Sequence, residues 1–282
     1  MLIYYRYPRY TLSKVVVILK ARNEEGQIEQ TLESLERQML RPCRLIVVDD
    51  GSTDHTADVA SRYGIELVRR PLRDESYLGR KELALTVNTG LDVIRHDYGF
   101  QYVCLSDADT IYPESYLHTI TQRMDQDPRL AITSGTIRGE FSVMPRGTGR
   151  VVRAKFWRQI GFSYPVNYGH ESWLLYKAAS IGHTYIVYTD IQMDTKRQTG
   201  SRFQPQTYRH YGRGMRALGY RPEYVLARCL RFLTRNPSGA VEMLRGYCAS
   251  HSELYEPDVR DYVRRTQSKL LWSRICGLGG RG

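Results

Sequence analysis

The sequence predicts an α/β fold: a mainly parallel β-sheet with helices on both faces, followed by an amphipathic helical extension at the C-terminal end. Three observations support this prediction. In the first half of the chain, short apolar runs alternate with segments whose apolar residues recur at helical spacing. Polar, acid-rich clusters follow several of the apolar runs. The last 80 residues are basic and contain helical patterns of their own.

The elements follow one another in a regular order. The apolar run Val15 to Leu19 predicts a strand, and the helix predicted next, over residues 25–38, carries Ile28, Leu32 and Leu35 at helical spacing. The same alternation predicts strands at residues 45–48, 65–68 and 101–105 and helices at residues 53–63 and 80–95. Continuous apolar strands joined by helices predict a parallel sheet, because right-handed crossovers place the helices over its faces.

Composition excludes several classes of protein. With 282 residues, 41% hydrophobic and 25% charged, the chain is globular and not disordered. No apolar run approaches the roughly 20 residues of a membrane span, and residues 1–10 do not resemble a secretion signal. The five cysteines are scattered without a Cys-x-x-Cys pair, which predicts free thiols. We therefore expect a cytoplasmic protein.

The net charge of +11 lies mostly in the tail. Residues 203–282 hold 14 Lys and Arg against 6 Asp and Glu, while residues 1–202 hold 27 against 24. A basic tail attracts nucleic acid, anionic lipid or phosphorylated substrates, and charge alone does not choose among them.

Three polar clusters are predicted at carboxyl ends of strands, where ligands bind in parallel sheets. They are residues 20–25, 49–54 and 106–109. Taken singly, each has a structural interpretation, since Asn23, Ser52, Thr53 or Asp54 could cap the helix that follows. Three acid-rich strand ends at one edge of one sheet instead predict a binding site.

Asp107 and Asp109 stand one residue apart after a buried strand. Two carboxylates in this position need a partner, and a hard divalent cation such as Mg²⁺ or Mn²⁺ prefers oxygen ligands and commonly also carries substrate phosphates. The alternative is that one of the two acids caps the next helix. The sequence therefore predicts a metal site, with Mn²⁺ or Mg²⁺ as the cofactor.

The order of residues 15–25, 47–54 and 107–109 resembles the family 2 glycosyltransferases with the GT-A fold, over about residues 13 to 195. The resemblance implies inverting transfer of a sugar from a nucleotide-diphosphate donor. It also implies the donor-site roles: Ala21 and Glu24 along the nucleoside, Asp50 as acceptor of hydrogen bonds from the base, Asp107 at ribose or metal, Asp109 on the metal, and Arg80 and Lys81 at base or phosphate.

The transfer needs a base for the proton of the acceptor hydroxyl. The family has a Glu-Asp pair followed at fixed offsets by Leu, Arg and Gly, and here His170-Glu171 keeps those offsets, which makes Glu171 the expected base. A shift of one residue would instead put Ser172, which is no base, at this position. A structural alternative is that Glu171 caps the helix running to Ser180.

The resemblance also suggests the remaining donor contacts. Where the family often has a metal-binding His, this chain has Asp194, the expected third ligand, with His183 as second candidate and a surface turn as the alternative. The polar segment 196–202 is expected to be a mobile loop that closes on the donor and brings Arg197 and Arg202 to the diphosphate, with Arg209 as a further candidate. Gly212-Arg213-Gly214 is expected to be a flexible turn between helices.

Two basic amphipathic helices are predicted in the tail, at residues 222–235 and 258–275. They either lie in an anionic membrane interface, which suits a polyprenyl-phosphate-linked acceptor, or pack on the catalytic domain. The first alternative predicts peripheral attachment to the inner face of the cell membrane.

The predicted organisation is an N-terminal extension over residues 1–12, a catalytic domain over 13–202 and a basic helical region over 203–282. The predicted function is transfer of a hexose from a GDP- or UDP-sugar to a hydroxyl of a glycan or lipid-linked acceptor. One alternative is a sugar nucleotidyltransferase, although no Gly-rich loop follows the first strand. The other is a nucleic-acid-binding protein, which would not need acids at three strand ends, so no nucleic acid is expected as a partner.

Overall fold

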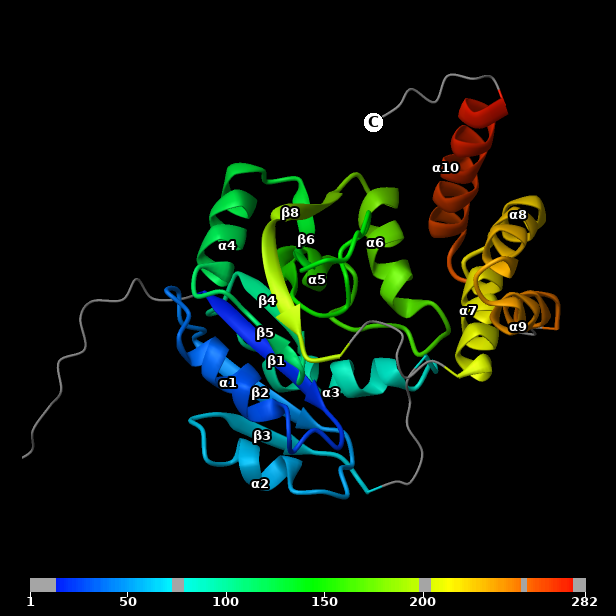
Figure 1. The fold of residues 1–282 in the computed structure, drawn as a ribbon. Helices are drawn as coiled ribbons and strands as arrows, with labels where there is room; N and C mark the ends of the chain where they lie inside the picture. Colours follow the sequence, from blue (N-terminus) through cyan, green and yellow to red (C-terminus); the bar gives the residue numbers. More distant parts are fainter. Residues whose placement is uncertain (1–13, 73–78, 198–203, 250–252, 276–282) are drawn as a thin grey trace, which may run out of the picture. The chain divides into compact units, whose positions relative to one another are not determined.

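The computed structural model describes residues 14–72, 79–197, 204–249 and 253–275 (Figure 1). The predicted extension 1–12 and Arg202 lie outside the described residues. The chain forms two compact units. The first contains Met1–Asp74, Thr86–Ser163 and Thr184–Arg197, and the second contains Glu75–Leu85, Tyr164–His183 and Gln198–Gly282. The predicted domain boundaries stay a prediction.

The first unit is built on one sheet, to which the described residues contribute eight strands in the order β3-β2-β1-β4-β7-β6-β8-β5. The strands β1 to β4 are parallel neighbours, whereas β7 is antiparallel to both β4 and β6, β6 is parallel to β8, and β5 is antiparallel to β8. The bounds are β1 Val15–Ala21, β2 Arg44–Asp49, β3 Glu66–Arg69, β4 Tyr102–Asp107, β5 Thr110–Ile111, β6 Leu130–Ile137, β7 Arg150–Arg153 and β8 Thr184–Thr195. The predicted α/β class and the four predicted strands are confirmed.

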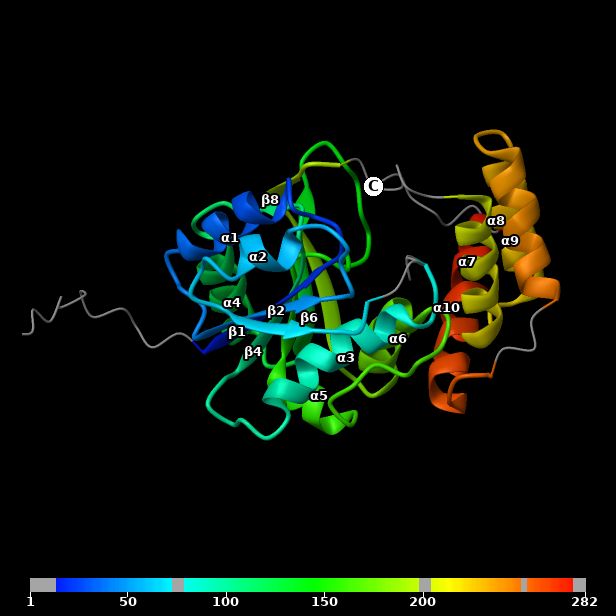
Figure 2. The same cartoon turned by 90° about the horizontal axis from the view of Figure 1, so that it is seen from below.

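Helices cover both faces of this sheet (Figure 2). Alternate residues of a strand point to opposite faces, so Val15, Val17 and Leu19 of β1 join one core with apolar residues of α1 and α4. On the other face, Ile18 contacts α3, where a Cβ added to Gly90 would lie 2.5 Å from the Ile18 side chain. The bounds are α1 Ile28–Glu36, α2 Thr56–Ala60, α3 Leu83–Ile94, α4 Tyr116–Gln126 and α5 Ala154–Gln159.

The second unit is helical, with α6 His170–Ser180, α7 Pro205–Ala217, α8 Pro222–Leu233, α9 Pro237–Cys248 and α10 Pro257–Ile275. Both predicted tail helices are confirmed. Helix α8 turns Val225 and Cys229 into a small core with residues of α7 and α9. Helix α10 packs on α6, where Lys177 Nζ pairs with Asp258 Oδ2 at 2.9 Å. Among the described residues, no helix combines the length and apolar character needed to cross a membrane.

The expectation of a flexible turn at Gly212-Arg213-Gly214 was wrong, because these residues lie inside α7. The glycines instead allow helices to approach closely. A Cβ on Gly212 would lie 2.0 Å from the Met243 carbonyl oxygen, and one on Gly246 would lie 2.0 Å from the Arg209 carbonyl oxygen. The backbones of α7 and α9 therefore touch where each helix has no side chain.

Candidate active site

The loops after β1 and β2 hold each other in place through reciprocal hydrogen bonds. The Asn23 backbone N–H donates to Ser52 Oγ at 3.0 Å, and the Thr53 N–H donates back to Asn23 Oδ1 at 2.9 Å. The Glu25 N–H donates to Asp54 Oδ2 at 3.2 Å, and the Glu24 N–H to Thr56 Oγ1 at 2.7 Å. Two of the predicted polar clusters therefore form a single structure, and the side chains taken as simple helix caps connect the two loops.

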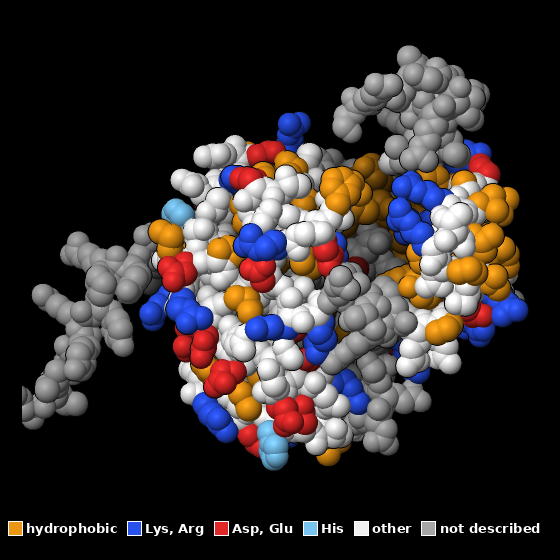
Figure 3. Space-filling model, in the orientation of Figure 1, with side chains coloured by type: hydrophobic (Ala, Val, Ile, Leu, Met, Phe, Trp, Pro, Cys, Tyr) orange, Lys and Arg blue, Asp and Glu red, His pale blue; other side chains and the backbone are white. Residues whose placement is uncertain are grey.

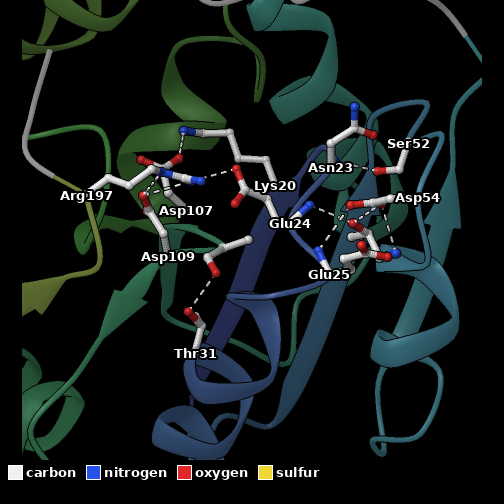
Figure 4. A network of polar contacts seen from close by, with 12 residues as sticks. Lys20, Asn23, Glu24, Glu25, Thr31, Ser52, Asp54, Asp107, Asp109 and Arg197 are labelled. Carbon is white, nitrogen blue, oxygen red and sulfur yellow. Dashed lines mark hydrogen bonds and ion pairs between the residues drawn. The ribbon is translucent and has the colours of Figure 1, made fainter. Parts of the chain in front are cut away.

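Five carboxylate and cationic side chains meet beside these loops (Figure 4). The Arg197 guanidinium, just beyond β8, donates through Nε to Asp109 Oδ2 at 3.0 Å and through Nη2 to Glu24 Oε1 at 2.6 Å. Lys20, the second-last residue of β1, forms an ion pair with Asp107 at the end of β4. The cluster thus joins the ends of β1, β4 and β8.

Electrostatics within this cluster favour a cation. Burial raises the pKa of the Asp109 carboxyl group, and the neighbouring charges of Asp107 and Glu24 raise that pKa further, while Arg197 opposes the shift. Burial alone would lower the pKa of Arg197, but Glu24 and Asp109 outweigh burial and raise that pKa. Carboxylates that repel one another in a buried place are stabilised by any positive charge brought between them.

Asp50 lies nearby on the β2 loop and is almost fully buried. Arg70, which follows β3, places Nε 3.3 Å from Asp50 Oδ1, and its Nη1 donates to Thr86 Oγ1 at 3.2 Å. Arg22 Nη1 donates to the carbonyl oxygens of Asp50 and Gly51, at 3.0 and 2.7 Å. Arg70 therefore holds the Asp50 carboxylate, and Arg22 holds the backbone of the same loop.

The cluster fits a divalent cation through two aspartates. Mg²⁺ and Mn²⁺ accept carboxylate oxygens and usually complete their shells with phosphate oxygens and water, so Asp107 and Asp109 suffice. Asp194 pairs instead with Arg138, whose Nε lies 2.8 Å from its Oδ1. Within the described ranges, no group of three His, Cys, Asp or Glu side chains that could hold a metal ion is found. The role of Asp194 as third ligand stays a prediction that this geometry does not favour.

The predicted site residues divide between the two units. Those of the first unit gather at the ends of β1, β2, β4 and β8, and they are Ala21, Glu24, Asp50, Asp107, Asp109 and Arg197. Arg80, Lys81 and Glu171 belong to the second unit. Arg209, predicted as a further diphosphate ligand, pairs with Glu242, Nε to Oε2 at 2.6 Å.

Glu171 lies in the first turn of α6. The N-cap of this helix is Gly169, which has a φ of 78° and no side chain, so Glu171 as a cap stays an alternative. Burial raises the pKa of Tyr211, and the Glu171 charge raises it further, which places the carboxylate close to that phenol on α7. The role of Glu171 as the base stays a prediction.

Sequence reasoning missed two cationic residues at this site. Lys20, which pairs with Asp107, was treated only as part of a polar cluster, and Arg70 was not considered. Both stand at the carboxyl end of a predicted strand. That position, the same signal that pointed to the aspartates, would have found them.

Comparison with known proteins gives a family and a fold. The family model described as Glycosyl transferase family 2 matches residues 16–180. A 54-residue segment is 46% identical to 4,4'-diaponeurosporenoate glycosyltransferase of Staphylococcus aureus, covering 19% of this chain. That segment spans only 14% of the relative's length.

Solved structures share the architecture of the chain. The mannosyltransferase PcManGT from Pyrobaculum calidifontis, solved in complex with GDP-Man and Mn²⁺, has a TM-score of 0.59 at 18% identity, covering 95% of this chain and 91% of that one. S. aureus TarS residues 1–349, in complex with UDP-GlcNAc, has a TM-score of 0.57 at 17% identity, covering 93% and 87%. At these identities the likeness shows the fold, which is GT-A.

Proposed function

Because the chain belongs to glycosyl transferase family 2, we propose that it transfers a hexose, with inversion, from a GDP- or UDP-sugar to a hydroxyl of a glycan or lipid-linked acceptor. The observation that carries this proposal is the cluster of Asp107, Asp109 and Glu24 around Lys20 and Arg197 at the strand ends. Such a cluster offers oxygen ligands to a cation and cationic groups to a diphosphate. Structural neighbours with GDP-Man and UDP-GlcNAc support the donor class.

The donor binds by its nucleotide in this proposal. Ala21 and Glu24 line the nucleoside, and the Asp50 carboxylate accepts hydrogen bonds from the N–H groups of the base. Arg70 helps to hold the Asp50 carboxylate in one direction, since Arg70 Nε and Asp50 Oδ1 lie 3.3 Å apart. Uracil and guanine both present N–H donors, so this carboxylate serves either base.

Asp107 and Asp109 would hold Mn²⁺ or Mg²⁺, with Asp194 as the less favoured third ligand; a bound metal neutralises charge on the leaving diphosphate. Arg197 and Lys20 exchange carboxylate partners for phosphate oxygens when the donor enters, and Arg80, Lys81 and Arg202 add positive charge. Bidentate guanidinium contacts to phosphate are strong and directional.

The chemical step is an in-line displacement at the anomeric carbon. The acceptor oxygen forms the new bond, the bond from carbon to the diphosphate oxygen breaks, and the nucleoside diphosphate leaves with the electron pair. Glu171 takes the hydroxyl proton as the bond forms. Attack from the face opposite the leaving group inverts the configuration.

A thermal-shift screen tests the donor site. The melting temperature is measured with GDP, UDP, ADP and their sugars, with and without Mn²⁺, because a ligand that binds the native state raises it. We expect a shift with GDP or UDP ligands that grows with Mn²⁺ and is lost in Asp50→Asn. The control Asp92→Asn removes an exposed carboxylate of α3 and should keep the shift. No shift with any nucleotide would contradict the proposal.

A further inference from the structure

Helix α8 presents two rows of side chains to solvent besides the face that packs in the core. Val225 and Cys229 are buried among α7 and α9. A second row, Leu226, Leu230 and Leu233, is 49%, 59% and 44% exposed. Spacings of four and three residues place these leucines on one side of the helix. Core packing therefore does not account for this apolar row.

Helix α9 adds to the same exposed apolar character. Val241 and Leu244, three residues apart, are 44% and 37% exposed, while Ala240 and Met243 face the core. Figure 3 shows hydrophobic side chains gathering at the surface over α8 and α9, with Lys and Arg side chains beside them. We call the set Leu226, Leu230, Leu233, Val241 and Leu244 the α8–α9 apolar surface.

The third row on α8 is basic and lacks acidic partners. Arg228, Arg231 and Arg235 are exposed, and the described residues supply no carboxylate that pairs with any of them. The acids of these helices are already engaged, since Glu223 pairs with Arg221, and Glu242 pairs with Arg209 and Arg245. At about 100° per residue, this arginine row lies on the side of α8 opposite the leucine row, and its charge is left for a partner of opposite charge.

We propose that the α8–α9 apolar surface docks on the headgroup region of an anionic lipid bilayer. The helices have 12 residues each, too short to span, so they would lie in the plane of the interface with the leucine row at the acyl boundary. A basic face opposite an apolar face is typical of helices that lie in the interface of an anionic bilayer. Anionic lipid matches the unpaired arginines, and the apolar row matches the acyl chains.

This surface also suits an enzyme whose acceptor carries a lipid, but the docking does not depend on sugar transfer. Its test is therefore independent of the proposed function: docking can fail while the donor-induced thermal shift persists, and the reverse.

The test is flotation of the full chain with vesicles of phosphatidylcholine alone or of phosphatidylcholine mixed with phosphatidylglycerol. We expect binding only to the mixed vesicles, weakened by high salt. Arg228→Gln, Arg231→Gln and Arg235→Gln combined should lower the partition coefficient by about tenfold or more. Arg37→Gln, Arg62→Gln and Arg129→Gln combined remove the same charge from exposed positions of the first unit, outside the α8–α9 apolar surface, and should leave the partition within about twofold of the parent.

The apolar row is tested with Leu226→Ser and Leu230→Ser combined. The control combines Val166→Ser and Leu254→Ser, which change exposed apolar side chains elsewhere in the same unit. The first pair should abolish flotation and the second should not, with unchanged circular dichroism melting in both. Equal binding to both kinds of vesicle, or wild-type flotation of the leucine and arginine variants, would overturn the proposal. So would a dimer in light scattering that Leu226→Ser and Leu230→Ser dissociate without any vesicle binding, since the surface would then be an interface between copies of the chain.

Discussion

Arg197 Nη2 lies 2.9 Å from Asp109 Oδ2, and the same nitrogen lies 2.6 Å from Glu24 Oε1. One guanidinium thus neutralises two carboxylates that come from different strand ends. A metal ion at Asp109 and the Arg197 guanidinium would compete for the same oxygens. We therefore expect Arg197 to exchange these carboxylates for the diphosphate when the donor and the metal bind.

The first prediction concerns this competition. Arg197→Ala should tighten binding of Mn²⁺ alone, by about tenfold or more, because a charge-assisted hydrogen bond worth about 1.5–3 kcal/mol no longer has to be displaced. The same change should weaken donor binding, which loses a phosphate contact. Isothermal titration with Mn²⁺ and then with the nucleotide sugar measures both effects.

The matched control is Arg123→Ala, which breaks another arginine–aspartate pair, with Asp190 on β8, away from the carboxylate cluster. It should alter neither titration. Weaker Mn²⁺ binding by Arg197→Ala would show that the arginine supports the metal site and does not compete with it.

A second prediction identifies the base. Glu171→Gln keeps the size of the side chain but cannot take a proton, so transfer should fall by about 10²–10⁴-fold while donor binding stays as in the parent. Ser172→Ala tests the alternative register and should keep transfer. Single-turnover transfer and donor titration separate the two effects, and full transfer by Glu171→Gln would remove this residue from the mechanism.

A third prediction links Asp54 to pH. Burial would raise the Asp54 pKa, but hydrogen bonds from the Thr56 hydroxyl and from the Thr56 and Glu25 N–H groups outweigh burial and lower it. A lowered folded-state pKa gives stability that is present above the unfolded-state pKa and is lost as the pH falls through the folded-state pKa. Asp54→Ala should therefore cost about 1–2 kcal/mol at neutral pH.

That cost should shrink once the pH falls below about 4, because the unfolded-state carboxyl becomes protonated there, before the folded-state carboxyl does. Urea unfolding at several pH values measures it. The control is Asp58→Ala, which removes an exposed acid of the following helix α2 and should show no comparable loss at neutral pH. A cost for Asp54→Ala that does not change with pH would mean that its ionised form contributes nothing.

A fourth prediction tests the contact between α7 and α9. Gly246→Ala would put a Cβ 2.0 Å from the Arg209 carbonyl oxygen, which cannot move aside like a flexible side chain. We expect a loss of about 1–3 kcal/mol or more in the free energy of unfolding. Gly64→Ala, with nothing within 4 Å of the added methyl group, is the control and should change stability little. Equal stability of the two variants would contradict the close approach of these helices.

The strands β1, β2 and β4 and the clusters at their ends could be predicted because each is a local pattern: an apolar run followed by polar residues. The partners of those clusters could not. Arg197 reaches Asp109 because β8 pairs with the two-residue strand β5, with Thr110 opposite Thr195. So short a strand has no periodicity to detect, and contacts across 88 residues depend on register. The pairing of Asp194 with Arg138 likewise joins residues far apart in the sequence and depends on register.

The glycines of α7 and α9 show the other limit. Local sequence predicts a turn at Gly212-Arg213-Gly214, because glycine is about 1 kcal/mol less favourable than alanine inside a helix. Tertiary packing outweighs this preference where two helix backbones must touch. A single sequence does not show the second helix surface that makes glycine necessary.

The most direct test of the central claim is the identity of the product released from GDP- and UDP-sugars in the presence of an acceptor hydroxyl and Mn²⁺, measured by chromatography for the parent, Asp109→Asn and Asp92→Asn. We predict that the parent and Asp92→Asn release nucleoside diphosphate only when a divalent metal is added, and that Asp109→Asn releases almost none. Release of pyrophosphate, or undiminished nucleoside diphosphate from Asp109→Asn, would contradict a transferase built on carboxylates at the strand ends.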